Sequence, residues 1–248
     1  MSEVAAPVPT EKLKHPSVIE AVCELRFARG APYSLVPGAM FERLRGQFPK
    51  SEVLPHAAFM AAVPDDIPVP PVPHHRFRGT SPNALIQTGP RLLTINILPV
   101  YPGFEDFRQL IVNTLEHYVA ITDPGNPVRV GLRYINLLRE SLGTGGLRDH
   151  LKISVSCPPE LPQPPQETSA RLVFGYGNVG TLGLSIAHPA RVGEGEIGTL
   201  LDLDFFWSGP GEFPLDRFPA WLDEAHQMVY GAFISTVKEN TLDVLRGR

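Results

Sequence analysis

The chain of 248 residues has only two cysteines, Cys23 and Cys157, and neither belongs to a Cys-x-x-Cys pair. This excludes a disulfide scaffold and the common zinc frameworks, because both need clustered cysteines. The eight histidines are scattered, without the i, i+4 spacing of a helical zinc site. Cys23 stands among apolar residues, where it is expected to be a small buried hydrophobe. The sequence therefore predicts no cofactor and no metal.

Long hydrophobic runs and a strong net charge are also missing. A membrane-spanning helix needs about 18 or more apolar residues in a row, which occur nowhere in the chain. The N-terminal residues lack the apolar core of a signal peptide. The net charge of −4 gives no general attraction for nucleic acid or for an anionic membrane. We expect a cytoplasmic protein that binds neither a membrane nor nucleic acid, and the sequence leaves its oligomeric state open.

Motifs for nucleophilic catalysis are absent, since the chain has no Gly-x-Ser-x-Gly elbow and no cysteine in an activating context. One stretch, "RLVFGYGNVGTLGLSI" (171–186), does contain Gly-x-Gly-x-x-Gly at Gly175, Gly177 and Gly180. A dinucleotide site needs a helix directly after these glycines, to bind the pyrophosphate. Here "TLGLSIAH" follows, whose pattern is that of a strand. The glycines are therefore predicted to form a hairpin turn.

Proline is abundant, with 27 residues, and it separates stretches of clear periodicity. Residues 18–28 and 128–140 alternate with period two, as strands do, whereas 36–49, 103–119 and 214–245 repeat with helical spacing. A short helix is also expected at 145–153. Proline-rich connections are expected at 49–73 and 157–166. Three short strands follow each connection. The order strand, helix, connection, three strands, helix thus occurs twice.

This order predicts the α+β class, with a mainly antiparallel sheet backed by long helices. We expect two tandem halves, 17–122 and 123–248, that join into one structural unit after a flexible arm at 1–16. Such an internal duplication would resemble the helix-grip, TATA-binding-protein-like pseudo-dimer. The two long lead strands would then be neighbours in the sheet.

Charged side chains gather on one face of each lead strand. The candidate partner-binding residues are Glu20, Glu24, Arg26, Arg129, Arg133 and Arg139. We predict that Glu20 or Glu24 pairs across the strands with Arg129 or Arg133. Tyr134 and Asn136 fall on the opposite, inner face, where the amide would need hydrogen-bond partners. The charged pairs would either set only the strand register or form a docking surface for a protein or an anionic ligand.

Two other carboxylate pairs have alternative interpretations. Asp202 and Asp204 share a strand face, and could hold a divalent cation or simply be the polar side of an alternating strand. Glu20 and Glu24 could act as an acid/base pair, although nothing identifies a substrate. The sequence favours the polar strand face for the first pair, because no third ligand lies nearby.

Three stretches resemble a bacterial family that is sporadically distributed and of unknown function. They are "HPSVIEAVCELRF", with Glu-Ala-Val-x-Glu-x-Arg-Phe, the central "VGLRYINLL", with Gly-x-Arg-Tyr-x-Asn, and the closing "HQMVYGAFISTVKENTL". The closing stretch departs from the family in having Thr236-Val237-Lys238 where an acidic residue usually follows the threonine. The resemblance implies no reaction, and its patchy distribution suggests an accessory of a mobile defence or toxin–antitoxin operon.

The absence of catalytic motifs together with a charged sheet face indicates a non-catalytic interaction protein. The alternative is a small-ligand or peptide binder, with a pocket between the sheet and the long helices. An enzyme or a nucleic-acid binder is less favoured.

Overall fold

The computed structural model describes residues 10–55, 72–80, 83–140, 146–162, 165–192 and 196–248. Most of the predicted arm and of the first proline-rich connection lie outside these ranges. The strands are β1 (Val18–Phe27), β2 (Lys50–Val53), β3 (His75–Arg78), β4 (Ala84–Gly89), β5 (Leu92–Ile97), β6 (Pro127–Arg139), β7 (Thr168–Gly175), β8 (Thr181–Val192) and β9 (Glu196–Trp207). The helices are α1 (Val36–Leu44), α3 (Phe104–Thr122), α4 (Leu147–His150), α5 (Phe218–Thr236) and α6 (Glu239–Arg246), with short 3₁₀ turns η1 (Tyr33–Leu35) and η3 (Leu215–Arg217).

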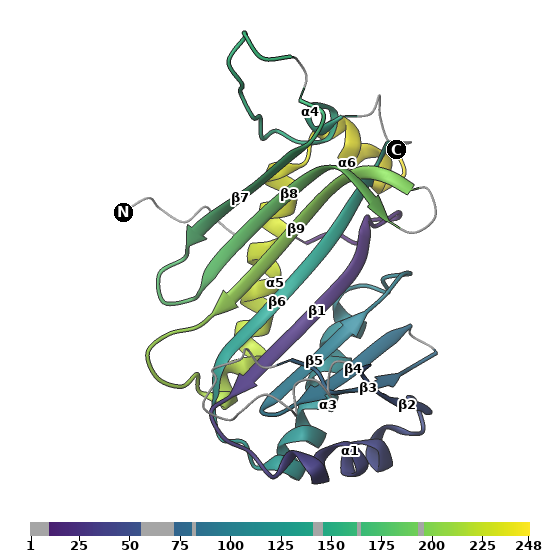
Figure 1. The fold of residues 1–248 in the computed structure, drawn as a ribbon, viewed down its shortest axis with the longest axis vertical. Coiled ribbons are helices and arrows are strands. Elements are labelled where there is room, and N and C mark those ends of the chain that lie inside the picture. Colours follow the sequence, from purple (N-terminus) through teal and green to yellow (C-terminus); the bar gives the residue numbers. More distant parts are fainter. Residues whose placement is uncertain (1–9, 56–71, 81–82, 141–145, 163–164, 193–195) are drawn as a thin grey trace. The chain divides into compact units, whose positions relative to one another are not determined.

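The described strands form one sheet in the order β2-β3-β4-β5-β1-β6-β9-β8-β7 (Figure 1). The predicted α+β class and its large antiparallel sheet are thus confirmed. The lead strands β1 and β6 are neighbours in this order, as the sequence predicts.

The chain divides into two compact units. Unit 1 consists of Met1–Ile19, Arg133–Phe205 and Asp223–Arg248, and unit 2 of Glu20–Leu132 and Phe206–Leu222. Strands β1, β6 and β9 and helix α5 each contribute residues to both units. The boundaries that the sequence suggests, at residues 16 and 122, stay predictions.

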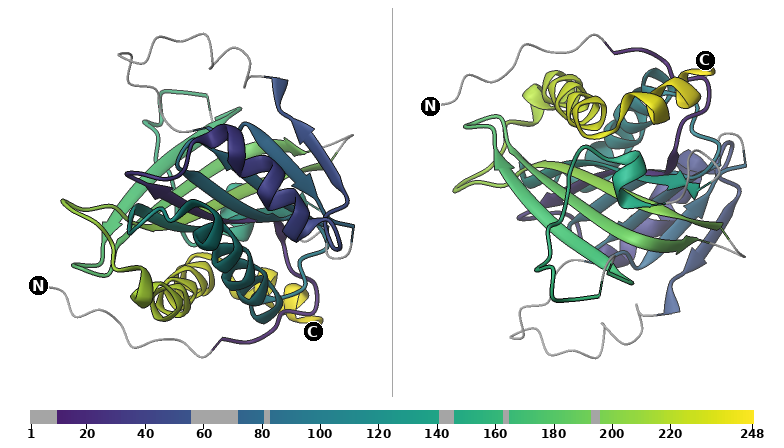
Figure 2. Two further views of the ribbon diagram at one scale, coloured as in Figure 1. Left: turned by 90° about the horizontal axis from the view of Figure 1, so that it is seen from below. Right: turned by 90° about the horizontal axis from the view of Figure 1, so that it is seen from above.

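The apolar face of the sheet in unit 2 is a cross-strand row of buried side chains. Cys23 of β1 lies opposite Ile95 of β5, which lies opposite Ile86 of β4, which in turn lies opposite Phe77 of β3. All four side chains are buried, as expected for the inward positions of alternating strands. Helix α3 packs on β5 and helix α1 on β3, and the two helices pack on each other (Figure 2). The polar positions of β1 therefore point away from these helices.

In unit 1, the glycine-rich stretch is a hairpin between β7 and β8. Gly175 lies opposite Thr181, and the Tyr176 N–H donates to the Gly180 carbonyl over 2.8 Å. Gly177 has φ of 57°, in the left-handed region that glycine adopts at low cost. No helix follows the glycines, so the dinucleotide fingerprint is excluded and the predicted hairpin is confirmed.

Two sequence expectations are wrong in detail. Residues 50–53, predicted to be part of the first connection, form strand β2, which pairs antiparallel with β3. All four side chains of β2 are exposed, so no apolar alternation marks it in the sequence. Only backbone pairing with its neighbour makes this segment a strand.

The single helix expected over 214–245 is also wrong, because the chain breaks between α5 and α6. Val237 forms an antiparallel bridge with Leu151, and the Lys152 N–H donates to the Thr236 carbonyl over 2.8 Å. Lys238 is extended, with φ −72° and ψ 151°, and its N–H donates to the His150 carbonyl. These contacts with the segment around α4 interrupt the helix, although the apolar spacing continues through Val237.

Candidate functional site

Glu24 in unit 2 is the centre of a cluster of ion pairs on the polar face of β1. Its carboxylate accepts hydrogen bonds from Arg129 Nη1 at 2.5 Å, and from Nε and Nη2 of Arg26 at 2.8 and 3.2 Å. The predicted pair between the lead strands is therefore confirmed, with Glu24 and Arg129 as its members. All three side chains are partly buried, which protects these hydrogen bonds from full solvent screening.

The Arg129 guanidinium is positioned by an aromatic ring and by a nearby glycine. It lies over the Phe206 ring, 5.0 Å from the centroid, within the range of a cation–π contact. Gly131, two residues further along β6, leaves room for it. A Cβ atom at residue 131 would lie 2.7 Å from Arg129 Nη1. A side chain at this position would therefore displace the guanidinium.

Glu20 does not pair with an arginine of β6 in the described structure. Its carboxylate accepts a hydrogen bond from Asn96 Nδ2 at 2.6 Å, and Asn96 Oδ1 accepts one from Gln87 Nε2 at 3.2 Å. Glu20 and Glu24 thus have separate partners, on β5 in one case and on arginines in the other. The geometry gives no shared proton site for the acid/base pair considered from the sequence.

Unit 2 also carries a polar row that the sequence analysis missed. The cross-strand register aligns Glu52, Arg76, Gln87, Thr94 and Glu24, one residue each from β2, β3, β4, β5 and β1. Arg76 Nη1 lies 3.4 Å from Glu52 Oε1. Arg76 Nε and Thr94 Oγ1 are buried without a hydrogen-bond partner in the described part of the chain. The pattern could only have been found from strand register, because each strand contributes a single member.

In unit 1, Arg133 forms a two-pronged ion pair with Asp202 of β9. The Nε–Oδ1 and Nη2–Oδ2 distances are 2.8 and 2.6 Å. The Arg133 side chain is 46% exposed, whereas Asp202 is 14% exposed. Asp202 is thus engaged by an arginine, and the described residues contain no group of three metal-ligating side chains. Arg139, at the end of β6, is half-buried.

Tyr134 and Asn136 lie on the buried side of β6, as the sequence predicts, with 6% and 2% of their surface exposed. Asn136 Oδ1 accepts a hydrogen bond from the Ser17 hydroxyl at 3.1 Å, and its Nδ2 donates to the Leu201 carbonyl at 3.3 Å. The Tyr134 ring centroid is 6.1 Å from that of His226 on α5. Residues from the three sequence stretches 15–27, 130–138 and 226–242 thus meet inside unit 1.

Burial lowers the pKa of His226 to about 4, while the nearby Asp223 carboxylate opposes this shift. The imidazole is therefore neutral at pH 7. Tyr230, one turn further along α5, has its ring centroid 6.3 Å from that of His226. His226 is half-buried and lies between two tyrosine rings, which indicates a packing role. The sequence analysis did not single out this residue.

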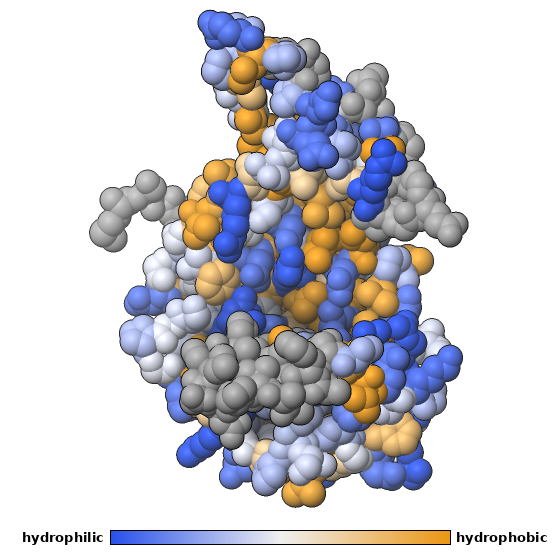
Figure 3. Space-filling view, in the orientation of Figure 1, coloured by the Kyte–Doolittle hydropathy of each residue, from blue (hydrophilic) through white to orange (hydrophobic). Residues whose placement is uncertain are grey.

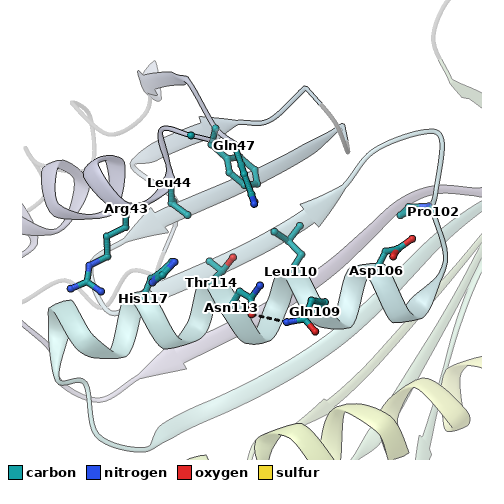
Figure 4. Close-up of a pocket in the computed structure, with 12 residues that line it drawn as sticks. Arg43, Leu44, Gln47, Pro102, Asp106, Gln109, Leu110, Asn113, Thr114 and His117 are labelled. Carbon is teal, nitrogen blue, oxygen red and sulfur yellow. Dashed lines mark hydrogen bonds between the residues drawn. The ribbon is translucent and has the colours of Figure 1, made fainter.

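A separate cleft of about 550 Å³ lies in unit 2 between α1, the turn that follows it, and α3 (Figure 4). Asp106, Asn113 and His117 of α3 and Arg43 of α1 supply polar lining. Gln109 Nε2 donates to Asn113 Oδ1 over 2.7 Å within this lining. The cleft is formed by two helices, so it differs from the pocket between sheet and long helices that the sequence suggests.

No protein-family model matches the chain, and the comparison with curated proteins gives no match either. None of the described helices combines the length and the apolar character that crossing a membrane requires.

Proposed function

We propose that this chain is a non-catalytic interaction protein that binds a partner protein through charged side chains of β1 and β6. The proposed surface in unit 1 is formed by Arg133 and Arg139, and that in unit 2 by Glu20, Glu24, Arg26 and Arg129. The observation that carries the proposal is the state of Arg133, whose guanidinium is fixed by Asp202 on two atoms and yet remains 46% exposed.

A fixed and exposed arginine suits recognition for an energetic reason. A flexible arginine loses side-chain entropy when a partner immobilises it, at a cost of about 0.5–1.5 kcal/mol. Asp202 already holds the Arg133 side chain, which lowers this cost. An acidic group of a partner could therefore bind the exposed part of the guanidinium. The net charge of −4 makes a nucleic acid a poorer partner than a protein with a local acidic patch.

The test is a charge swap, Arg133→Asp with Asp202→Arg, compared with the wild-type chain. The swap keeps an ion pair between β6 and β9 but moves the positive charge to the other strand. Both proteins are immobilised at equal density and used to capture partners from native lysate, with quantitative mass spectrometry as the readout. We expect the swap to reduce capture of the wild-type partner at least about tenfold, which corresponds to 1.4 kcal/mol.

The matched control is Arg45→Glu, a charge reversal at an exposed arginine directly after α1. Arg45 pairs with Glu42 and does not line the cleft, so this variant should leave capture unchanged. Retained folding of the swap is checked by its circular dichroism and thermal unfolding. Equal capture by wild type and swap would show that Arg133 only fixes the strand register. A loss that Arg45→Glu reproduces would show a nonspecific charge effect.

We also propose the finer architecture of a duplicated helix-grip unit. Its support is the strand order, in which β1, β5, β4 and β3 follow one another to one side and β6, β9, β8 and β7 to the other. Each set has its lead strand first and its remaining strands in reverse chain order. Strand β2 is an addition to the first set. An association with a mobile defence or toxin–antitoxin operon stays a prediction from the resemblance alone.

A small-ligand binder is the second candidate function, and the cleft between α1 and α3 favours it. Its size is within the usual range for small-molecule sites, and its lining combines Leu110 with charged side chains. Native mass spectrometry of mildly purified protein would detect a retained small mass. Leu110→Trp, which fills the cleft, should remove that mass if it is bound there.

A further inference from the structure

Strand β7 is the last strand of the sheet order and pairs with β8 along one edge. Its eight residues contain no proline and a single charged residue, Arg171. Along its other edge, no strand of the described structure pairs with it. Backbone N–H and C=O groups on such an edge form a template for a further strand.

Three consecutive side chains of β7 are apolar and nevertheless exposed to solvent. Leu172, Val173 and Phe174 are 39%, 60% and 44% exposed. Leu172 lies opposite Leu184 and Phe174 opposite Leu182, and these β8 residues are buried. The side chains that bury β8 in unit 1 therefore do not extend over β7. Figure 3 shows apolar surface along this edge.

Strand β2, at the other end of the sheet order, differs from β7 because it has features that discourage pairing with a further strand. It has only four residues, and two of them, Lys50 and Glu52, are charged. Short length and charge are the usual protection of an edge strand. Strand β7 has twice the length and lacks this protection, which singles it out as an interaction edge.

We propose that β7 pairs antiparallel with β7 of a second copy of this chain, about a two-fold axis perpendicular to the sheet. Such an axis keeps the equivalent faces of both copies on the same side. Residues that face each other then have the same parity, so the axis passes beside one residue of each strand. We place it at Leu172.

Charge and shape select this register. Centring on Leu172 sets Leu172 against its own copy, the large Phe174 against the small Ala170, and Val173 against the aliphatic stem of Arg171. It pairs residues 169–175 throughout. Centring on Arg171 instead would set two arginines directly opposite each other, which is destabilising. The size and polarity of the side chains of β7 thus match those of a second β7 strand in this register, which is why we choose a second copy as the partner.

The first experiment measures oligomeric state by sedimentation velocity. One strand pair buries less than a standard interface of about 1,600 Å², so the dimer should dissociate on dilution and the protein is examined over a wide concentration range. Val173→Lys should shift the dimer to monomer. The matched control is Val53→Lys on β2, which is 63% exposed and changes charge identically. The control should remain dimeric.

The second experiment tests the register by disulfide crosslinking in a Cys157→Ser background, since Cys157 is partly accessible and Cys23 is buried. Directly opposed residues have Cα atoms about 4.5–5.5 Å apart, within disulfide range. Leu172→Cys should therefore crosslink the dimer under mild oxidation. Val173→Cys should not, because the two thiols would be diagonal neighbours, about 7–8 Å apart.

A dimer that is lost in Val173→Lys, kept in Val53→Lys and crosslinked through residue 172 supports the proposal. A monomer at every concentration overturns it, as does a dimer that Val173→Lys leaves intact. Failure of residue 172 to crosslink in a confirmed dimer also overturns it. Since β7 contains none of the residues of the proposed partner surface, these outcomes are independent of the capture experiment.

Discussion

Replacing His226 with phenylalanine should change how the stability of this protein depends on pH. His226 is held between Tyr134 and Tyr230, and burial lowers its pKa from 6.5 to about 4, with Asp223 opposing the shift. Between these two values the unfolded chain binds a proton on this histidine and the folded chain does not. The free energy of unfolding must therefore fall as the pH falls through this window.

The size of the effect follows from the two pKa values. From pH 7.5 to pH 4.5, His226 alone should lower the free energy of unfolding by about 2–3 kcal/mol, and the loss should level off below about pH 4. Carboxylates elsewhere contribute a pH dependence of their own, which is common to wild type and variant. The difference between the two proteins isolates the histidine.

Urea unfolding of wild type and His226→Phe at several pH values between 4.5 and 7.5 measures this difference. The variant should lose about 2–3 kcal/mol less than wild type over the range. His15→Gln, which removes an exposed histidine, serves as the control and should follow wild type. Parallel curves for wild type and His226→Phe would refute the assignment of a buried, neutral imidazole.

Two further predictions concern single contacts in unit 2. In a double-mutant cycle of Glu24→Gln and Arg129→Met, measured by urea unfolding, we expect a coupling of about 1 kcal/mol, and no coupling would contradict a fixed ion pair. Gly89→Ala should destabilise by about 1–3 kcal/mol, because its Cβ would lie 2.2 Å from the Val72 carbonyl oxygen. Gly38→Ala should instead stabilise the protein by about 0.5 kcal/mol, because nothing lies within 4 Å of the new Cβ. Equal melting temperatures for the two variants would contradict the close approach of Gly89 to Val72.

Period-two alternation located the lead strands and their faces well. Ala21, Cys23, Leu25 and Phe27 are buried and Glu24 is on the other side, as their spacing indicates. The reason is that successive side chains of a strand point to opposite faces of the sheet. A strand with one buried face therefore has apolar residues at every second position. Strand β2 has no buried face and left no such pattern.

Which charges meet was only partly predictable. The pair of Glu24 with Arg129 follows from two charged faces on adjacent strands, and the structure contains it. Arg133 instead binds Asp202, from a strand that no sequence pattern places beside β6. The Thr94 hydroxyl, which has no hydrogen-bond partner in the described part of the chain, was equally hidden, because its neighbours Gln87 and Glu24 come from two other strands.

Local periodicity and turn chemistry, by themselves, determined the class of this protein, the inner and outer faces of β1 and β6, and the hairpin at Gly177. These features depend on residues within one element, whose backbone geometry is fixed by short-range sterics. Tertiary structure alone decided the order of the strands on either side of β1 and β6, the partners of Arg133 and Asn136 and the break before α6. It also decided that, among the described strands, β7 has one unpaired edge. These depend on contacts between residues far apart in the chain, and such contacts are set by how the elements share a core rather than by the sequence of any one of them.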